Sequence, residues 1–283
     1  MTPTVPPLEE LAAPSHWRTV DFISDLHLQA CEPATVQAFR RYLHATQADA
    51  VFLLGDLFEV WVGDDALLEP GSFEADCAAT LREAAARRPL FFMQGNRDFL
   101  TGAQFDALCG TTTLADPTVL DCGDQRILLS HGDALCLDDT DYQRFRAMAR
   151  SAAWQAAFLA QPLPLRREQA RGIRQESESR KRESAGADAA APSASHTAAM
   201  PTYADLDAEA TRSWLRAARA ATLVHGHTHR PADHELGDGL RRVVLSDWDL
   251  AAAVPRAEVL RWEQGQGLRR LPLSEVLEQA PQR

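Results

Sequence analysis

Five short motifs in this chain carry side chains that could bind metal ions. In chain order they are Asp25-Leu26-His27, Gly55-Asp56, Gly95-Asn96-Arg97-Asp98, His131-Gly132-Asp133 and Gly226-His227-Thr228-His229. They offer carboxylate and amide oxygens, imidazole nitrogens and one guanidinium, which is the set of groups that cleavage of a phosphate ester with two metal ions requires. Any one motif occurs by chance in many proteins, so the prediction depends on all five occurring together.

The spacing of these residues divides them between two metal ions. Asp25 and His27 are two residues apart, so at the end of a strand both side chains can point to the same side and bind one ion. The same spacing separates His227 from His229, and the carboxylate of Asp56 can bridge both ions. The predicted ligand sets are Asp25, His27, Asp56 and His229 for one ion and Asp56, Asn96, His131 and His227 for the other. Oxygen and nitrogen ligands without thiolate suit Mn²⁺, Fe²⁺ or Zn²⁺ better than Ca²⁺.

Each of these residues, taken alone, also has an explanation that involves no metal. Asn96 follows a glycine, where asparagine usually forms a turn, and a single histidine such as His131 is more often an ordinary core or surface residue. We predict that Asp98 and Asp133 are not ligands and accept hydrogen bonds that orient imidazole or guanidinium groups. His225 lies one position out of register with the other histidines of its motif, so its side chain is expected to face the other way.

Each motif follows a short apolar run that is typical of a buried strand. These runs are residues 19–24, 50–54, 90–94, 126–130 and 223–224. Val36, Phe39 and Leu43 recur at helical spacing after the first run, and a second helix is expected at 72–86, so the chain has the β-α-β pattern of an α/β fold. In such folds, sites form beyond the carboxyl ends of the strands, where the candidate ligands lie. Three further runs within 241–273 are predicted to be strands of a second sheet.

The composition limits the class of protein. At 283 residues and 31.2 kDa, the chain is long enough for one large α/β domain with an insertion. A net charge of −11 argues against nucleic-acid binding through a basic face. We expect no transmembrane helix, because no run of about 18 apolar residues is present. The five cysteines, an odd number without C-x-x-C spacing, are typical of reduced thiols.

The remaining sequence divides into a domain, an insertion and two ends. Residues 1–16 lack a basic start and an apolar core, so they are predicted to be a disordered leader and not a signal peptide. Residues 17–273 are predicted to form the main domain. A helical insertion is expected at 139–182, and residues 184–201, rich in Ser, Ala and Pro, are predicted to form a flexible loop. Residues 274–283 are expected to be a tail.

The motifs and the residues around them resemble the calcineurin-like metallophosphoesterase superfamily and, in detail, one family within it. The longer strings are SDLHL at 24–28, LLGDLFEVWVGDD at 53–65, GNRDFL at 95–100, HGDALCLDD at 131–139 and HGHTHRP at 225–231. They are similar to the UDP-2,3-diacylglucosamine pyrophosphatase family of lipid A biosynthesis, over residues 18–182 and 203–273. The resemblance implies a two-sheet β-sandwich core flanked by helices, with the insertion as a helical lid.

The resemblance also implies a reaction, a cofactor and site residues. The family hydrolyses a lipid-linked nucleotide, UDP-2,3-diacylglucosamine, to UMP and 2,3-diacylglucosamine 1-phosphate, through attack on the α-phosphorus by water that two Mn²⁺ ions activate. It acts in the cytoplasm, peripherally associated with the inner membrane. Arg97 and Asp56 are then catalytic, and the implied metal ligands are Asp25, His27, Asp56, Asn96, His131, His227 and His229. The implied substrate contacts are Asn96, Arg97, Asp139, Ser177, Lys181 and His227, with Lys181 taken from a loosely aligned stretch.

Arg97 supports this substrate class on chemical grounds. Many members of the superfamily carry a histidine at this position, which can protonate an alkoxide leaving group, whereas an arginine cannot give up a proton at neutral pH. Hydrolysis of a pyrophosphate releases a phosphate monoester, which is a weak base and needs charge stabilisation more than a proton. Arg97 therefore favours cleavage of a P–O–P bond over cleavage of an alkyl phosphodiester.

The insertion indicates where a lipid substrate could bind. Its apolar residues Trp154, Phe158, Leu159 and Leu163 could shelter acyl chains, and the basic residues at 166–182 could meet phosphate or an anionic membrane surface. The alternative is a solvated basic face beside an ordinary core stripe. Two other functions stay open, namely a two-metal phosphohydrolase that acts on soluble nucleotides or phosphodiesters, and a non-catalytic scaffold. The sequence does not indicate an oligomeric state.

Overall fold

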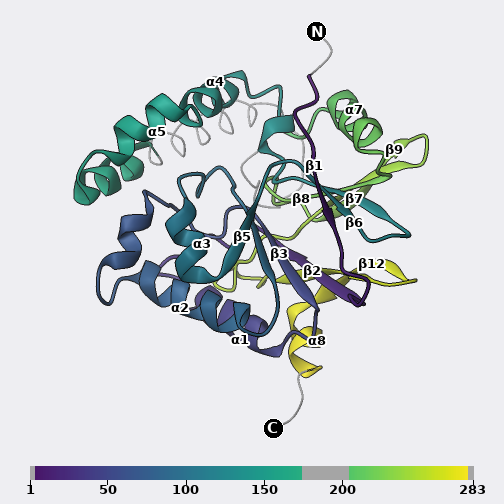
Figure 1. Cartoon of the computed structure of the whole chain (residues 1–283), viewed down its shortest axis with the longest axis horizontal. Helices are drawn as coiled ribbons and strands as arrows, with labels where there is room; N and C mark the ends of the chain where they lie inside the picture. Colours follow the sequence, from purple (N-terminus) through teal and green to yellow (C-terminus); the bar gives the residue numbers. More distant parts are fainter. Residues whose placement is uncertain (1–3, 174–203, 280–283) are drawn as a thin grey trace.

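Two β-sheets packed face to face form the centre of the computed structural model, which describes residues 4–173 and 204–279 (Figure 1). The first sheet contains, in spatial order, β1 (Glu9–Ala12), β6 (Thr118–Asp121), β7 (Arg126–Leu129), β8 (Thr222–His225), β10 (Leu240–Val244) and β9 (Ala232–Gly237). The second sheet contains β12 (Gly267–Pro272), β11 (Glu258–Glu263), β2 (Thr19–Ile23), β3 (Ala50–Leu54), β4 (Leu90–Met93) and β5 (Thr111–Leu114). Phe22, Phe52, Val224 and Val243 are fully buried in the apolar layer between the sheets. The predicted α/β fold with a two-sheet core is confirmed.

Helices cover the outer faces of both sheets (Figure 1). α1 (Pro33–Ala45), α2 (Phe73–Ala85), α3 (Ala103–Cys109) and α8 (Leu273–Glu278) pack against the second sheet, and α7 (Ala208–Ala218) packs against the first. α2 confirms the helix expected at 72–86, and it begins after Ser72, whose side chain accepts a hydrogen bond from the Ala75 N–H. No helix in the described ranges is long and apolar enough to cross a membrane.

Parallel pairing brings the motifs to one end of the sandwich. β2, β3 and β4 are parallel neighbours in the second sheet, and β7 and β8 are parallel neighbours in the first. All five residues of β3 are buried, because the other sheet covers one face and helices cover the other. The carboxyl ends of these strands therefore meet, and the motifs follow directly after them.

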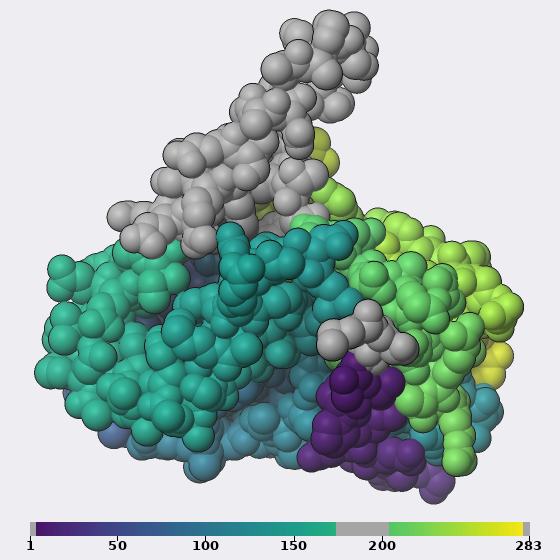
Figure 2. Space-filling view, turned by 90° about the horizontal axis from the view of Figure 1, so that it is seen from above, coloured from purple at the N-terminus to yellow at the C-terminus, as the bar shows by residue number. Residues whose placement is uncertain are grey.

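A run of helices, here called the cap, lies over this end of the sandwich (Figure 1 and Figure 2). It consists of α4 (Thr140–Ala149), α5 (Ala152–Leu159) and a helix at residues 163–173. The cap agrees with the predicted helical insertion as far as residue 173. Ser177, Lys181 and the loop predicted at 184–201 lie outside the described residues.

Two arginines, Arg166 and the half-buried Arg167, anchor the cap to the segment after β3. Arg166 is only 2% exposed, and its guanidinium donates hydrogen bonds to the Val62 carbonyl and the Asp65 carboxylate. Arg167 forms an ion pair with Glu69 at 2.7 Å. The sequence leaves open whether these two arginines meet phosphate or an anionic membrane surface or belong to a solvated basic face, and in this structure both pair with carboxylates of the same chain.

Two predictions about the ends of the chain are corrected by the structure. Residues 9–12, which the sequence assigned to a disordered leader, form β1, because their backbone pairs in parallel with β6. The three runs predicted within 241–273 do not share one new sheet. β10 pairs with β8 in the first sheet, whereas β11 pairs with β2 and extends the second sheet with β12.

Candidate metal centre

The backbone turns sharply at the strand ends that carry the motifs. Among the described residues, seven that are not glycine have a positive φ angle, and five of these belong to the motifs. The five are Asp25, His27, Asp56, His227 and His229. A left-handed backbone costs energy for residues with a Cβ atom, and it persists where the surrounding structure enforces it. Its concentration at these positions marks them as parts of one rigid, specialised site.

Glycines in the motifs allow the loops to approach one another. A Cβ atom on Gly95 would collide with the carboxylate of Asp56, and one on Gly226 would collide with the carboxylate of Asp25. Each glycine therefore lets the next loop lie directly against a candidate ligand. This explains why the motifs contain these glycines beside the polar residues.

Three of the four residues predicted to bind the first ion lie close together. The two Nε2 atoms of His27 and His229 are 3.2 Å apart, and Nε2 of His229 is 3.4 Å from Oδ1 of Asp25. The donor atoms of the three residues all lie within 4.8 Å of one another. The structure therefore brings together Asp25, His27 and His229 as the sequence predicted.

The second group forms around Asn96. Its Oδ1 atom lies 2.8 Å from Nδ1 of His227 and 3.0 Å from Nε2 of His131. Asp56 lies between the two groups, with Oδ1 3.7 Å from Nε2 of His131 and Oδ2 3.9 Å from Nε2 of His27. Its position fits the bridging role predicted for it.

The charges of the centre favour a bound cation. Burial opposes ionisation of Asp25, but the hydrogen bond and charge of His229 outweigh burial and lower the pKa of the carboxyl below its usual range. Burial also opposes protonation of His131, yet the nearby carboxylates, Asp56 foremost, raise the pKa of this imidazole to about 9. A buried set of oxygen and nitrogen donors that attracts positive charge fits divalent metal ions.

Asp133 orients groups of the cap, as predicted. It is fully buried and accepts hydrogen bonds from Nε of Arg146 at 2.8 Å and from the Tyr142 hydroxyl. Burial raises its pKa, but Arg146 and Arg150 outweigh burial, so the pKa lies below the usual range. The ring of Tyr142 stacks on the ring of His227 with centroids 6.0 Å apart, so α4 contacts the centre directly.

Asp98 acts differently from the prediction. Its carboxylate accepts backbone N–H groups from Gly95 at 2.7 Å and from Leu57 at 2.8 Å, and it orients neither an imidazole nor a guanidinium through these bonds. Burial and the charge of Asp56 raise its pKa to about 7. Asp98 therefore ties the loops after β3 and β4 together.

His225 faces away from the centre, as expected. Its Nε2 lies 3.4 Å from the guanidinium of Arg242, on the other side of the loop. Burial and this guanidinium lower the pKa of His225 to about 3. The residue is therefore neutral and takes part in the packing of the loop.

Two carboxylates at the centre were missed in the sequence analysis. Oε2 of Glu59 lies 2.9 Å from Nδ1 of His27, and Oε1 lies 3.7 Å from the guanidinium of Arg97. Asp247 lies 3.9 Å from Nδ1 of His229 and forms an ion pair with Arg256 at 2.7 Å. Glu59 was within reach of sequence reasoning, because it belongs to the GDLFE string three residues after Asp56. The SDW string that holds Asp247 gave no comparable signal.

The residues predicted to contact substrate lie in different parts of the structure. Asn96 and His227 belong to the second group, and the N–H of Arg97 donates to Oδ1 of Asp56 at 2.8 Å. Asp139 is exposed and caps α4 by accepting a hydrogen bond from the Tyr142 N–H.

Comparison with known proteins agrees with this geometry. The family model described as calcineurin-like phosphoesterase matches residues 18–231. A UDP-2,3-diacylglucosamine hydrolase from Chromobacterium violaceum is 44% identical over 256 residues, which cover 90% of this chain and 98% of the relative. Proteins of the same name from Ralstonia nicotianae and Chromohalobacter salexigens are 44% and 41% identical, over 87% and 81% of this chain and 90% and 89% of their own lengths.

Proposed function

The chain belongs to the calcineurin-like phosphoesterase family, and we propose that it is a metal-dependent hydrolase of lipid A biosynthesis that cleaves the pyrophosphate bond of UDP-2,3-diacylglucosamine. The products are UMP and 2,3-diacylglucosamine 1-phosphate. The observation that carries this proposal is the 44% identity to a hydrolase of that substrate over 98% of the relative's length. The assembled candidate metal centre supports it and disfavours a non-catalytic scaffold.

Two Mn²⁺ ions are the proposed cofactors. The residues that would hold them are Asp25, His27, Asp56 and His229 for one ion and Asp56, Asn96, His131 and His227 for the other. When bound, such ions activate the attacking water and neutralise charge on the phosphoryl oxygens. Asp56 keeps both sets in register because its two oxygens face opposite groups.

Arg97 is proposed to stabilise the charge of the pyrophosphate as it is cleaved. Its backbone N–H is fixed by Asp56 and its guanidinium lies beside Glu59, so the side chain is held next to the metal centre. A guanidinium keeps its positive charge at any working pH and can contact phosphate oxygens in a forked geometry. The water attacks the α-phosphorus, and the lipid phosphate leaves.

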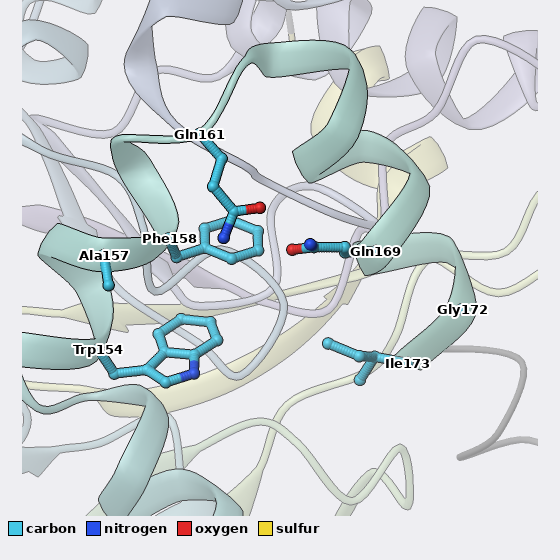
Figure 3. Close-up of a pocket in the computed structure, with 7 residues that line it drawn as sticks. All are labelled: Trp154, Ala157, Phe158, Gln161, Gln169, Gly172 and Ile173. Carbon is cyan, nitrogen blue, oxygen red and sulfur yellow. The ribbon is translucent and has the colours of Figure 1, made fainter.

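An apolar cavity in the cap supports a substrate with acyl chains. Its volume is about 410 Å³, and Trp154, Phe158 and Ile173 line it from α5 and the helix at 163–173, together with the glutamines Gln161 and Gln169 (Figure 3). The ring of Trp154 lies 6.2 Å from the ring of Phe99, two residues after Arg97. The cavity therefore lies close to the loop that carries the proposed catalytic arginine, as one substrate molecule would require.

We also propose peripheral contact with the cytoplasmic face of the inner membrane, where a lipid-linked substrate resides. Leu159, Leu165 and Ile173 of the cap are each 41–42% exposed, and Met148 is 50% exposed. These residues are distributed over the three helices of the cap, and exposed apolar side chains on such helices can insert at the boundary between headgroups and acyl chains. The cap would then face the membrane from which the substrate enters.

The decisive experiment is incubation of the purified, Mn²⁺-loaded protein with UDP-2,3-diacylglucosamine in detergent micelles, with release of UMP measured by chromatography. We expect UMP release that stops on chelation of the metal. Absence of UMP release by the metal-loaded protein would contradict the proposal. UDP-glucose and bis(4-nitrophenyl) phosphate serve as soluble comparisons, and equal turnover of either would favour a phosphohydrolase of soluble substrates.

A further inference from the structure

Arg150 stands between α4 and α5 of the cap and contacts two loops of the sandwich at once. Its guanidinium donates a hydrogen bond to the Gly95 carbonyl at 2.9 Å and lies 3.7 Å from the carboxylate of Asp133. The same guanidinium lies above the ring of Phe99, 5.8 Å from the ring centroid. One arginine of the cap therefore contacts both ends of the segment 95–99, which follows β4.

The segment 95–99 carries two residues of the proposed site. Asn96 is a proposed metal ligand, whose Oδ1 lies beside the two imidazoles of the second group, and Arg97 is proposed to stabilise the pyrophosphate. The carbonyl that Arg150 binds belongs to the peptide group that joins Gly95 to Asn96. This hydrogen bond therefore restrains the backbone immediately before both residues.

Other hydrogen bonds hold the same segment through its N–H groups. The Gly95 N–H donates to Asp98 at 2.7 Å, and the Arg97 N–H donates to Asp56 at 2.8 Å. Gly95 is buried, and a buried carbonyl that lacks a partner is costly. Arg150 supplies the donor for this carbonyl, so the cap completes the set of bonds that fixes the segment.

The carboxylate of Asp133 keeps the guanidinium of Arg150 in this place. Asp133 is fully buried and lies after β7, two residues beyond the proposed ligand His131. The side chain of Arg150 is 21% exposed, and the carboxylate offsets its charge. Arg150 therefore joins the segment 95–99 of the second sheet to the segment after β7 of the first sheet, and both segments supply ligands for the second proposed ion.

We propose that Arg150 is a positioning residue for the reaction, an inference that rests on the proposed function. From the cap, it fixes the peptide before Asn96 and so sets where Arg97 stands relative to the metal ligands. Arg166, in contrast, binds the segment after β3 and does not contact the segment 95–99 through its hydrogen bonds. Seating of the cap and placement of Arg97 are thus linked through the side chain of Arg150.

The test compares the steady-state kinetics of Mn²⁺-loaded wild-type protein and Arg150→Ala on UDP-2,3-diacylglucosamine, and repeats the comparison in proteins that carry Arg97→Ala. Arg150→Ala is expected to lower kcat about tenfold and to leave KM within about twofold, because a displaced Arg97 slows the chemical step. In the Arg97→Ala background, the same substitution should lower kcat by less than about threefold, since the group that it positions is already absent.

Two further measurements separate positioning from folding. Hydrogen exchange of the Mn²⁺-loaded proteins without substrate should become faster at 95–99 in Arg150→Ala and stay unchanged in β2. Arg150→Lys keeps the charge but not the planar guanidinium, so it should recover part of the lost kcat, and it carries the same comparison if Arg150→Ala does not fold. Arg144→Ala removes an exposed arginine of α4 that pairs with Asp141, and it serves as the matched control.

Three results would overturn the inference. A rise in KM with unchanged kcat would make Arg150 a contact of the substrate. Losses of kcat that multiply in the double variant would show that it acts independently of Arg97, and unchanged hydrogen exchange at 95–99 would show that it does not hold this segment. Failure of the proposed function is separate, because the wild-type protein would then release no UMP from the lipid nucleotide.

Discussion

The metal centre and the cap over it are built in opposite ways. The centre joins residues from Asp25 to His229, which follow five strands of two sheets and are mostly buried. The cap is one continuous segment, and α4 and α5 bury one residue each, Ala149 and Phe158. Its polar anchors include Arg166, which bonds to the loop after β3, and Asp133, which accepts a hydrogen bond from Arg146.

This difference indicates that the centre and the cap affect different steps of the reaction. The centre has a fixed backbone, because strand pairing and several left-handed residues over-determine its geometry. The cap buries few residues of α4 and α5, although Phe158 and Leu163 reach the apolar cluster beside the second sheet, so its attachment combines a few apolar contacts with charged anchors. We therefore expect changes at the centre to lower kcat and changes in the cap, apart from Arg150, to raise KM.

The largest effect is expected for Asp56→Asn, which replaces the carboxylate between both ligand groups. Loss of its charge should weaken binding of both ions and lower kcat on the order of 10³-fold. Steady-state kinetics with metal analysis by mass spectrometry would measure this. Asp141→Asn, at an exposed position in the cap, is the control. A near-normal kcat in Asp56→Asn would show that turnover does not depend on the proposed metal centre.

The next largest effect is expected for Arg97→Ala. Its kcat should fall by about 10²-fold, because the site then lacks the fixed positive charge that stabilises the pyrophosphate as it is cleaved. Metal content should stay normal, since the side chain is not a proposed ligand. Arg97→Lys keeps the charge without the forked geometry and should recover only part of the activity. If turnover of the lipid nucleotide in Arg97→Ala matched the wild type, charge stabilisation by this residue would be wrong.

Glu59→Gln tests a residue that contacts a proposed metal ligand but is not itself a proposed ligand. The carboxylate of Glu59 lies beside both His27 and Arg97. The Glu59→Gln protein, which lacks this charge, should therefore bind Mn²⁺ about 10-fold to 100-fold more weakly than the wild type. Titration of metal-free protein with Mn²⁺ gives the affinity. The control is Glu83→Gln, where an exposed glutamate lies 3.9 Å from His44. An unchanged Mn²⁺ affinity would show that the charge of Glu59 does not contribute to metal binding.

The smallest effect on chemistry is expected for Arg166→Ala, which removes the buried anchor of the cap. KM for the lipid nucleotide should rise about tenfold, with a much smaller change in kcat, because the apolar cavity loosens while the metal centre stays intact. Hydrogen exchange should become faster across 140–173 and not in β3. Arg144→Ala, which breaks an exposed ion pair within α4, provides the comparison. A fall in kcat equal to that of Arg97→Ala would show that the cap and the centre act as one unit.

Much of the centre could be predicted because its signals are local. Asp25, Asp56 and His131 each stand directly after an apolar run, and two-residue spacing in Asp25–His27 and His227–His229 sets which side chains share a side. Glu59 was missed although the string around Asp56 offered a local signal for it, whereas the place of Asp247 beside His229 depends on how a distant loop folds back. Asp98 was assigned the wrong partners for the same reason, since its carboxylate reaches backbone groups of another loop.

The sequence by itself determined which residues stand at the strand ends and which kinds of ligand they offer, because alternation along a strand and apolar runs are properties of neighbouring residues. Only the tertiary structure decided that β10 joins β8 while β11 joins β2, and that residues 9–12 pair with β6. It also decided how Asp56 faces both groups and how Arg166 fixes the cap. These outcomes depend on contacts between residues far apart in the chain, which packing of the whole core selects and no local pattern encodes.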